Sequence, residues 1–249
     1  MKRKRRLLFG TYLVILVFLV GLLAFVGAAC LPGRGIPDDK TPEPAVSMSQ
    51  SDQQRPQSVE YYVESADPLV RNTAVSAVRD CPDEIEANSE AWKIWQINRW
   101  AAGNIRYVSD PKGHNYFAYA HETINAGGGD CDDFAILLAS LYESVGLDAA
   151  IASIDTDDDW IMDHMTCLVY YSGDGEAFIE EEKTILDILG MSSDARILCF
   201  DPAHSNLLPK KYSSGIWIVA DPTMAIVKEK VGYVAHKPYQ AVFVIDVGS

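Results

Sequence analysis

The sequence predicts an α+β domain in which helices come first and a mostly antiparallel sheet follows, behind an N-terminal membrane anchor. Three observations support this fold class. The chain starts with a long uncharged apolar run, its first half repeats apolar residues at helical spacing, and its second half breaks into short β-branched or aromatic runs. With 249 residues, 48% of them apolar, the chain can bury a sizeable core.

The N-terminal segment has the charge pattern of a membrane anchor. Residues 1–6 include five basic residues, and residues 7–29 carry no charge. A helix of about 20 residues crosses a bilayer, whereas the apolar region of a secretory signal usually has about 7–15. We therefore expect a single-pass anchor over residues 1–30, with everything after Cys30 extracytoplasmic. Gly27-Ala28-Ala29-Cys30 also resembles a lipoprotein cleavage site, so a lipid on Cys30 remains an alternative anchor.

Composition divides the rest of the chain into two parts. Residues 31–58 are rich in Pro, Gly, Ser, Gln and Asp, which predicts a disordered linker, and residues 59–249 form one domain. The net charge of −14 excludes nucleic acid as a partner and is compatible with cationic or amine-bearing substrates.

Two helices are predicted ahead of the first chemical motif, over residues 66–79 and 89–105. The second helix carries apolar residues at helical spacing, namely Ile94, Ile97, Ala101 and Ile105. It also carries Trp92, Trp95 and Trp100. These side chains either pack in the core, which we favour, or stack on a ligand.

The most informative motif is Gly127-Gly128-Gly129-Asp130-Cys131-Asp132-Asp133, which ends a glycine turn and starts a helix. Asp130 is a suitable N-cap, so Cys131 falls in the first turn, where free backbone N–H groups favour a thiolate. Asp132 and Asp133 oppose that ionisation by repulsion. The helix ends at Gly146, and its apolar face comprises Phe134, Leu137, Leu138, Leu141, Tyr142 and Val145.

Five strands are predicted after this helix, at residues 149–154, 164–171, 196–200, 216–220 and 241–247. The acidic run 155–159 lies between the first two. It lacks the sixth-position glycine of a calcium loop, where Trp160 stands. We interpret it as a solvated hairpin tip, with a loose cation- or amine-binding rim as the alternative.

A cysteine nucleophile needs a base and an acceptor that orients the base. His164 opens a strand, and alternation directs it to the same side as Thr166 and Leu168, against which the Cys131 helix is expected to pack. The other histidines are predicted in loops: His114, His121, His204 and His236.

Two aspartates are candidates for the acceptor. Asp221 ends the strand 216–220 before Pro222, and Asp201 ends an earlier strand before Pro202. We favour Asp221 because its strand is the more regular. Either residue could instead be an ordinary turn aspartate.

The remaining cysteines do not suggest another chemistry. Apart from Cys30 and Cys131 there are Cys81, Cys167 and Cys199, which allow at most one disulfide. No C-x-x-C spacing is present, which argues against a zinc site. The sequence thus predicts no metal and no cofactor.

Together these motifs resemble the transglutaminase-like superfamily. The resemblance runs from about Trp92 to Thr223 and rests on Gly-Asp-Cys-Asp-Asp before an apolar helix, on His164 opening a strand, on Trp217 with Asp221-Pro222-Thr223, and on residues 105–110. It implies a papain-like core and acyl transfer on amides through a thioester. It also implies a triad in which Cys131, His164 and Asp221 act as nucleophile, base and orienting residue.

One departure from the family pattern is the 57-residue separation of His164 and Asp221. An insertion over about residues 173–214, with a helix-like part at 180–189, is expected to form a lid or a specificity wall. The second oxyanion donor stays open, with Gln96 as one candidate.

The predicted function is a membrane-anchored, extracytoplasmic cysteine hydrolase or acyltransferase that acts on peptide or isopeptide amides. Its partners would be the membrane and a peptide, protein or cell-envelope substrate. The alternative is a non-catalytic module that binds a peptide or a cell-envelope polymer in the same cleft.

Overall fold

The computed structural model describes residues 58–111, 115–192, 197–225, 230–232, 234 and 238–248, all of which belong to the compact unit Ser51–Ser249. The predicted anchor and nearly all of the predicted linker lie outside the described residues, as do Cys30, His114 and His236. Among the helices that are described, none has the length and apolar character needed to cross a membrane.

The described helices are η2 (Val59–Tyr62), α2 (Pro68–Val78), α3 (Glu90–Asn104), α4 (Ala120–Ala126), α5 (Cys131–Ser144) and α6 (Gly175–Ile188). The helices up to α5 come before the five-stranded sheet in the chain, as predicted, whereas the last helix lies within the predicted insertion, after the second strand of the sheet. Local chemistry sets their starts, because the Asp67 side chain caps α2 and the Ser89 side chain accepts from Trp92 N at the start of α3. The short helix α4 was not predicted.

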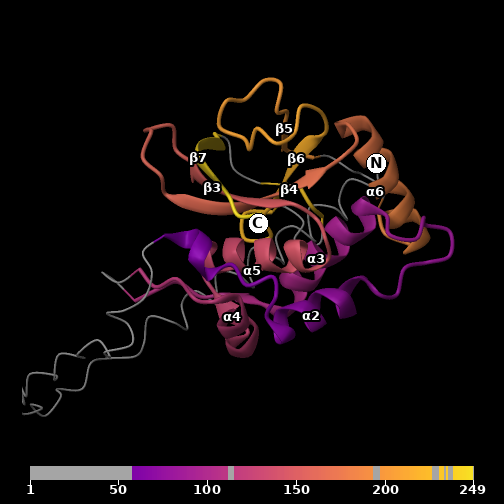
Figure 1. Ribbon diagram of the computed structural model, residues 1–249, viewed down its shortest axis with the longest axis horizontal. Coiled ribbons are helices and arrows are strands. Elements are labelled where there is room, and N and C mark those ends of the chain that lie inside the picture. The colour runs from indigo at the N-terminus through magenta and orange to yellow at the C-terminus, as the bar shows by residue number, and fades with distance from the viewer. Residues whose placement is uncertain are drawn as a thin grey trace, which may run out of the picture. The chain divides into compact units, whose positions relative to one another are not determined.

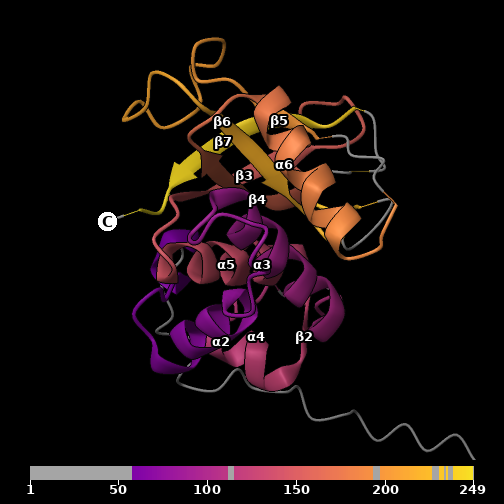
Figure 2. The ribbon, with the colours of Figure 1, turned by 90° about the vertical axis from the view of Figure 1, so that its right-hand side faces the viewer.

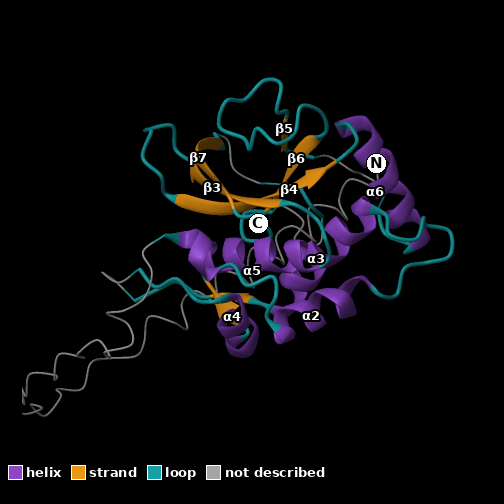
Figure 3. Ribbon diagram, viewed as in Figure 1, coloured by secondary structure: helices purple, strands orange, loops and turns teal. Residues whose placement is uncertain are grey.

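The strands form one antiparallel sheet of five and a separate parallel pair (Figure 3). In the sheet β5 (Cys199–Phe200), β6 (Ile216–Ala220), β4 (His164–Tyr171), β3 (Ala149–Asp155) and β7 (Gln240–Asp246) lie side by side in that order. The small pair joins β1 (Arg106–Tyr107) to β2 (Gly128–Gly129). A mixed helix and sheet fold with a mostly antiparallel sheet is thus confirmed.

Helix α5 lies at the centre of the domain. It packs on β4 and β3 on one side and on α2, α3 and α4 on the other (Figures 1 and 2). The single apolar face predicted for α5 was therefore too narrow: the helix is buried nearly all round, because layers cover it on two sides. Trp92 and Trp95 are buried in this core, which confirms their predicted packing role.

The sheet face opposite α5 has a smaller core of its own, formed by Ala150, Ala152, Ile154, Leu168, Leu208, Trp217 and Val219. The insertion expected as a lid contributes to it. Its first half forms α6, which packs against α3, and its second half carries Leu208 and Tyr212 onto the outer sheet face, where Tyr212 stacks on Tyr170. This second half therefore covers the sheet rather than α5.

Candidate active site

Cys131 is the first residue of α5, and the glycine turn before it sets its position. Gly127 ends α4 in the left-handed region, at φ 64°, and Gly128–Gly129 then pairs with β1. A side chain at Gly129 would put its Cβ 2.5 Å from the Cβ of Asp133. Glycine is thus required at this position, where the strand meets the first turn of the helix.

Asp133 ties this turn to its surroundings. Its Oδ1 accepts from Ala118 N at 2.8 Å, and its Oδ2 accepts from Asp130 N at 3.3 Å, which is half of a capping box. Burial raises the pKa of the Asp133 carboxyl to about 6 although these backbone hydrogen bonds lower it. The side chain fixes the start of α5 from inside the protein.

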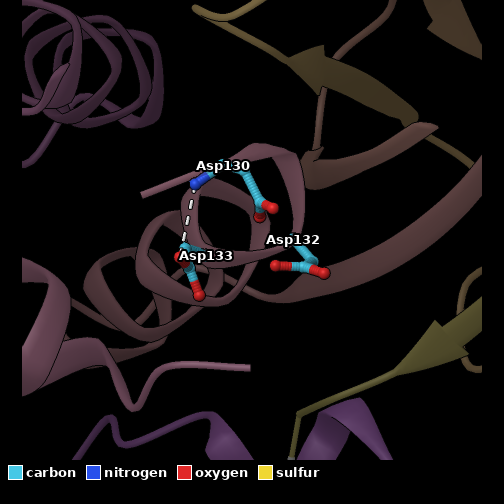
Figure 4. Close-up of side chains that lie close together, drawn as sticks. All are labelled: Asp130, Asp132 and Asp133. Carbon is cyan, nitrogen blue, oxygen red and sulfur yellow. Dashed lines mark hydrogen bonds between the residues drawn. The ribbon is translucent and has the colours of Figure 1, made fainter. Parts of the chain in front are cut away.

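Asp130 and Asp132, which flank Cys131 in the sequence, lie close to each other (Figure 4). Asp132 is 5% exposed, and one oxygen of each carboxyl has no hydrogen-bond partner. Burial, a hydrogen bond that protonated Asp132 donates to Asp130, and the neighbouring negative charges raise the pKa of Asp132 well above its ordinary range. The raised pKa favours the neutral form of Asp132, which reduces the repulsion expected between it and a Cys131 thiolate.

Asp130, Asp132 and Asp133 are also residues that could hold a cation, since each offers one oxygen and these oxygens lie within 4.8 Å of one another. Two features oppose such a site. Both oxygens of Asp133 already accept backbone N–H groups, and the N-terminus of a helix carries partial positive charge. A proton held between Asp130 and Asp132 meets the same need for positive charge, so we assign no metal here.

His164 and Asp221 form a buried pair at the other side of Cys131. Asp221 follows β6, whose last residue Ala220 pairs with Cys167 of β4, so its carboxylate lies near the start of β4. His164 Nε2 lies 2.7 Å from Asp221 Oδ2, and the two side chains are 7% and 2% exposed. The turn after Asp221 adds donors to Oδ1 from Thr223 and Met224.

Cys131 lies close enough to His164 to raise the pKa of the imidazole. Since Nε2 contacts Asp221, the nitrogen left for the sulfur is Nδ1. Burial by itself would lower the pKa of His164, but the hydrogen bonds and charges of Asp221 and Cys131 raise it to about 9. The pKa of Asp221 is lowered, because the contacts with His164 and Tyr239 outweigh its burial. At neutral pH, Asp221 and Cys131 together therefore favour the imidazolium form of His164.

The alternation argument for His164 was wrong about the packed face. Helix α5 packs in the cluster that holds Cys167 and Val169, whereas Leu168 belongs to the outer cluster. His164 meets Cys131 because it is the first residue of β4, at the end of the sheet, rather than because its face of the strand is covered by α5.

The other predicted candidates lie elsewhere. Asp201, the alternative acceptor, contacts His204 at 2.9 Å rather than His164. Its carboxylate also accepts from Ala203 N, and both partners lie in the exposed turn that follows Asp201. His121 contacts Glu64. Gln96 lies half-buried in the middle of α3.

Two tyrosines near Cys131 were missed from the sequence. Tyr239 donates to Asp221 Oδ2 at 2.6 Å. Burial and Asp221 raise the pKa of Tyr239 well above the usual range, so the phenol remains a donor. Tyr107 pairs with Gly129 in the β1–β2 ladder, and its pKa is raised by burial and by the nearby Cys131. The only sequence signal that pointed to Tyr107 was its place in the segment 105–110, which carries part of the family resemblance. No sequence signal pointed to Tyr239.

The acidic run between β3 and β4 is a hairpin tip, as favoured from the sequence. Asp155 is buried, and its oxygens accept the backbone N–H groups of Asp157, Asp158 and Trp160. Through these hydrogen bonds the Asp155 carboxylate fixes the backbone of the turn.

The fold and the site define a mixed helix and sheet protein with a cysteine at a helix start and a histidine–aspartate pair at one end of an antiparallel sheet. Residues 79–186 match the family model described as the transglutaminase-like superfamily. The resemblance to this superfamily that the sequence motifs indicated is thus confirmed over these residues. Cys131 and His164 lie within the matched residues, and Asp221 lies beyond them.

The comparisons with curated proteins and with solved structures show less similarity. No curated protein matches the sequence. One similar solved structure is described as "a Putative Cysteine Protease from Cytophaga hutchinsonii", with 22% sequence identity and a TM-score of 0.35. The match covers 44% of this chain and 35% of that chain.

Proposed function

We propose that the protein is a cysteine acyl-transfer enzyme that acts on peptide or isopeptide amides, with Cys131 as nucleophile, His164 as base and acid, and Asp221 as the residue that orients His164. The observation that carries the proposal is the buried, hydrogen-bonded pair of His164 and Asp221, whose imidazole is also influenced by Cys131 at the start of α5. The apolar run 7–29 supports a membrane-anchored, extracytoplasmic location.

In the first step the Cys131 thiolate adds to the amide carbonyl carbon and forms a C–S bond. The oxyanion accepts hydrogen bonds from backbone N–H groups of the first turn of α5, which have no partner within the helix. The C–N bond then breaks as the proton on His164 Nδ1 passes to the departing amine. A thioester remains on Cys131.

In the second step water or a second amine attacks the thioester and gives its proton to His164. The acyl group leaves as a carboxylic acid or as a new amide, and Cys131 returns to the thiolate. Asp221 keeps its negative charge throughout and holds the ring orientation through Nε2.

A polypeptide substrate is supported by a hollow beside the glycine turn. Its lining includes Val108, Tyr116, Gly128, Gly129 and Asp133, so it begins directly after β1 and extends to the glycine turn that precedes Cys131. The exposed side chain of Val108 contributes to this lining. A segment of extended chain laid in this hollow would lie beside the turn that leads to Cys131.

The test is the rate of iodoacetamide alkylation of Cys131 between pH 5 and 10, in the parent and in His164→Ala. A thiol with an ordinary pKa of about 8.5 is almost fully protonated at pH 6 and reacts slowly there. We expect fast alkylation at pH 6 in the parent, reduced by at least about tenfold in the variant. His204→Ala, in an exposed turn, is the matched control.

Slow alkylation at pH 6 in both proteins would contradict the proposal. It would favour instead a transglutaminase-like module that binds a peptide or a cell-envelope polymer without reacting with it.

A further inference from the structure

The tip of the β3–β4 hairpin, residues 156–163, exposes three consecutive apolar side chains. Trp160, Ile161 and Met162 are 73%, 66% and 56% exposed. The connection extends past the end of the sheet at which β4 begins (Figure 1). Single exposed apolar residues need no explanation, but adjacent large ones are typical of a surface that binds a partner.

The tip is held in one conformation. Asp155 Oδ1 accepts from Asp157 N and Asp158 N at 3.0 and 2.8 Å, and its Oδ2 accepts from Trp160 N at 2.7 Å. Asp163 closes the turn by accepting from the backbone and hydroxyl of Thr156. Asp158 and Trp160 have φ of 69° and 65°, a region unfavourable for residues with side chains. A buried carboxylate thus keeps a strained turn that presents Trp160 to solvent.

The charged residues of the tip itself are all acidic. Asp157, Asp158, Asp159 and Asp163 flank the three apolar residues in sequence, and the chain contains no Lys or Arg between residues 113 and 182. That stretch supplies the tip, α5, β3 and β4. Anionic lipid headgroups would be repelled, whereas a polypeptide with a basic side chain beside an apolar one would meet both complementary charge and apolar contact.

The tip is joined to the candidate active site in two ways. His164 follows Asp163 directly, and Gln240 Nε2 donates to Asp158 Oδ1 at 3.0 Å. Gln240 is the neighbour of Tyr239, which contacts Asp221. The tip therefore adjoins the end of the sheet that carries His164 and Asp221.

We propose that this tip is the substrate-selecting surface of the enzyme, and that it takes a polypeptide segment with a bulky apolar residue next to Lys or Arg near the reactive amide. The inference rests on the proposed function for its role in selecting substrates, whereas binding of such a segment does not require catalysis.

The experiment compares alkylation of Cys131 by iodoacetyl-Leu-Arg-amide and by iodoacetyl-Leu-Glu-amide, each rate divided by that of iodoacetamide to correct for the reactivity of the thiol. In the parent we expect the Arg reagent to react at least about tenfold faster than the Glu reagent, which corresponds to ~1.4 kcal/mol. A tip variant combines W160S, I161S and M162S with D157N and D159N. In this tip variant we expect the ratio of the Arg-reagent rate to the Glu-reagent rate to fall below about twofold.

A matched control replaces three other exposed apolar residues with serine, namely Tyr61, Leu69 and Val75 of η2 and α2. We expect this control variant to react faster with the Arg reagent than with the Glu reagent, as the parent does. Equal rates for the two reagents in the parent, or an unchanged ratio in the tip variant, would overturn the inference. So would tip-dependent binding to phosphatidylcholine vesicles, or a dimer in sedimentation that the tip variant loses.

If the proposed function is wrong, the experiment gives a different result. In that case iodoacetamide itself reacts slowly at pH 6, and the tip is tested by fluorescence anisotropy with fluorescein-labelled Leu-Arg and Leu-Glu peptides. The same tenfold preference, lost in the tip variant, would still support the binding surface, and its absence would refute it.

Discussion

At the scale of single residues, Asp221 organises the candidate site. Its Oδ1 accepts from Thr223 and Met224, and its Oδ2 accepts from His164 and Tyr239. The local donors fix the carboxylate through the turn that follows β6, and Tyr239 fixes it from the start of β7. The carboxylate that orients His164 is thus held from two elements far apart in sequence.

Removal of the Tyr239 hydroxyl tests this arrangement. In Tyr239→Phe one donor to Asp221 is lost while the ring stays, so His164 is positioned less well. We expect alkylation of Cys131 at pH 6 to slow by about threefold to tenfold, with the high-pH limit unchanged. Tyr170→Phe, which loses a hydroxyl bound to the Ser214 carbonyl on the outer face, should react like the parent. Identical pH profiles for both variants would contradict a positioning role.

Asp132 offers a test of the buried acid pair. Its pKa is raised by burial, so the folded protein holds a proton that the unfolded chain releases above pH 4. The resulting stabilisation is complete at low pH and is lost as pH rises. We expect Asp132→Asn, which needs no proton, to weaken this pH dependence and to raise the unfolding midpoint at pH 8 by a few degrees. A lower midpoint at pH 8 in thermal unfolding would show that the carboxyl makes contacts that an amide cannot replace.

At the scale of elements, the glycine turn and α5 act together. Gly129→Ala places a methyl group against the Asp133 side chain, which is held by Ala118 and Asp130. We expect it to cost about 2–4 kcal/mol in urea unfolding, since the capping interaction must shift. The control is Gly103→Ala in α3, where the methyl group meets open space and alanine favours the helix by about 1 kcal/mol. Equal effects of the two substitutions would refute the steric argument.

The elements themselves could be predicted to different degrees. The apolar period of α5 and the β-branched runs of β4 and β6 are strong local signals, and these elements lie within a residue or two of the predicted bounds. The helix α4 and the pair β1–β2 have no comparable signal. The pair β1–β2 depends on segments that meet only after folding, and its two-residue strands carry too little sequence pattern to be recognised.

At the scale of the whole molecule, His164 links stability to pH. Its pKa of about 9 lies above the ordinary value of 6.5, so the folded protein binds a proton that the unfolded chain loses through neutral pH. This stabilisation is present in full below pH 6.5 and disappears as pH rises to 9. The free energy of unfolding of the parent, measured with urea, should fall by about 1–3 kcal/mol over that pH window, and that of His164→Gln should fall less. Parallel curves for the two proteins would contradict the buried ion pair.

The anchor is tested on the full chain. If residues 7–29 span a bilayer, the expressed protein stays in the membrane fraction after carbonate washing and enters solution only with detergent. A chain that begins at Ser58 should be recovered without detergent. Recovery of the full chain in the carbonate supernatant would refute the anchor.

The sequence by itself determined the chemical components and the class of the fold. Cys131 at a helix start, His164 at a strand start and Asp221 before a proline are signals of local structure, and periodicity separates helices from strands. Only the tertiary structure decided that burial raises the pKa of Asp132, that Tyr239 contacts Asp221 and that the second half of the insertion packs on the outer sheet face. These features depend on burial and on contacts between residues distant in the chain, which no local pattern encodes.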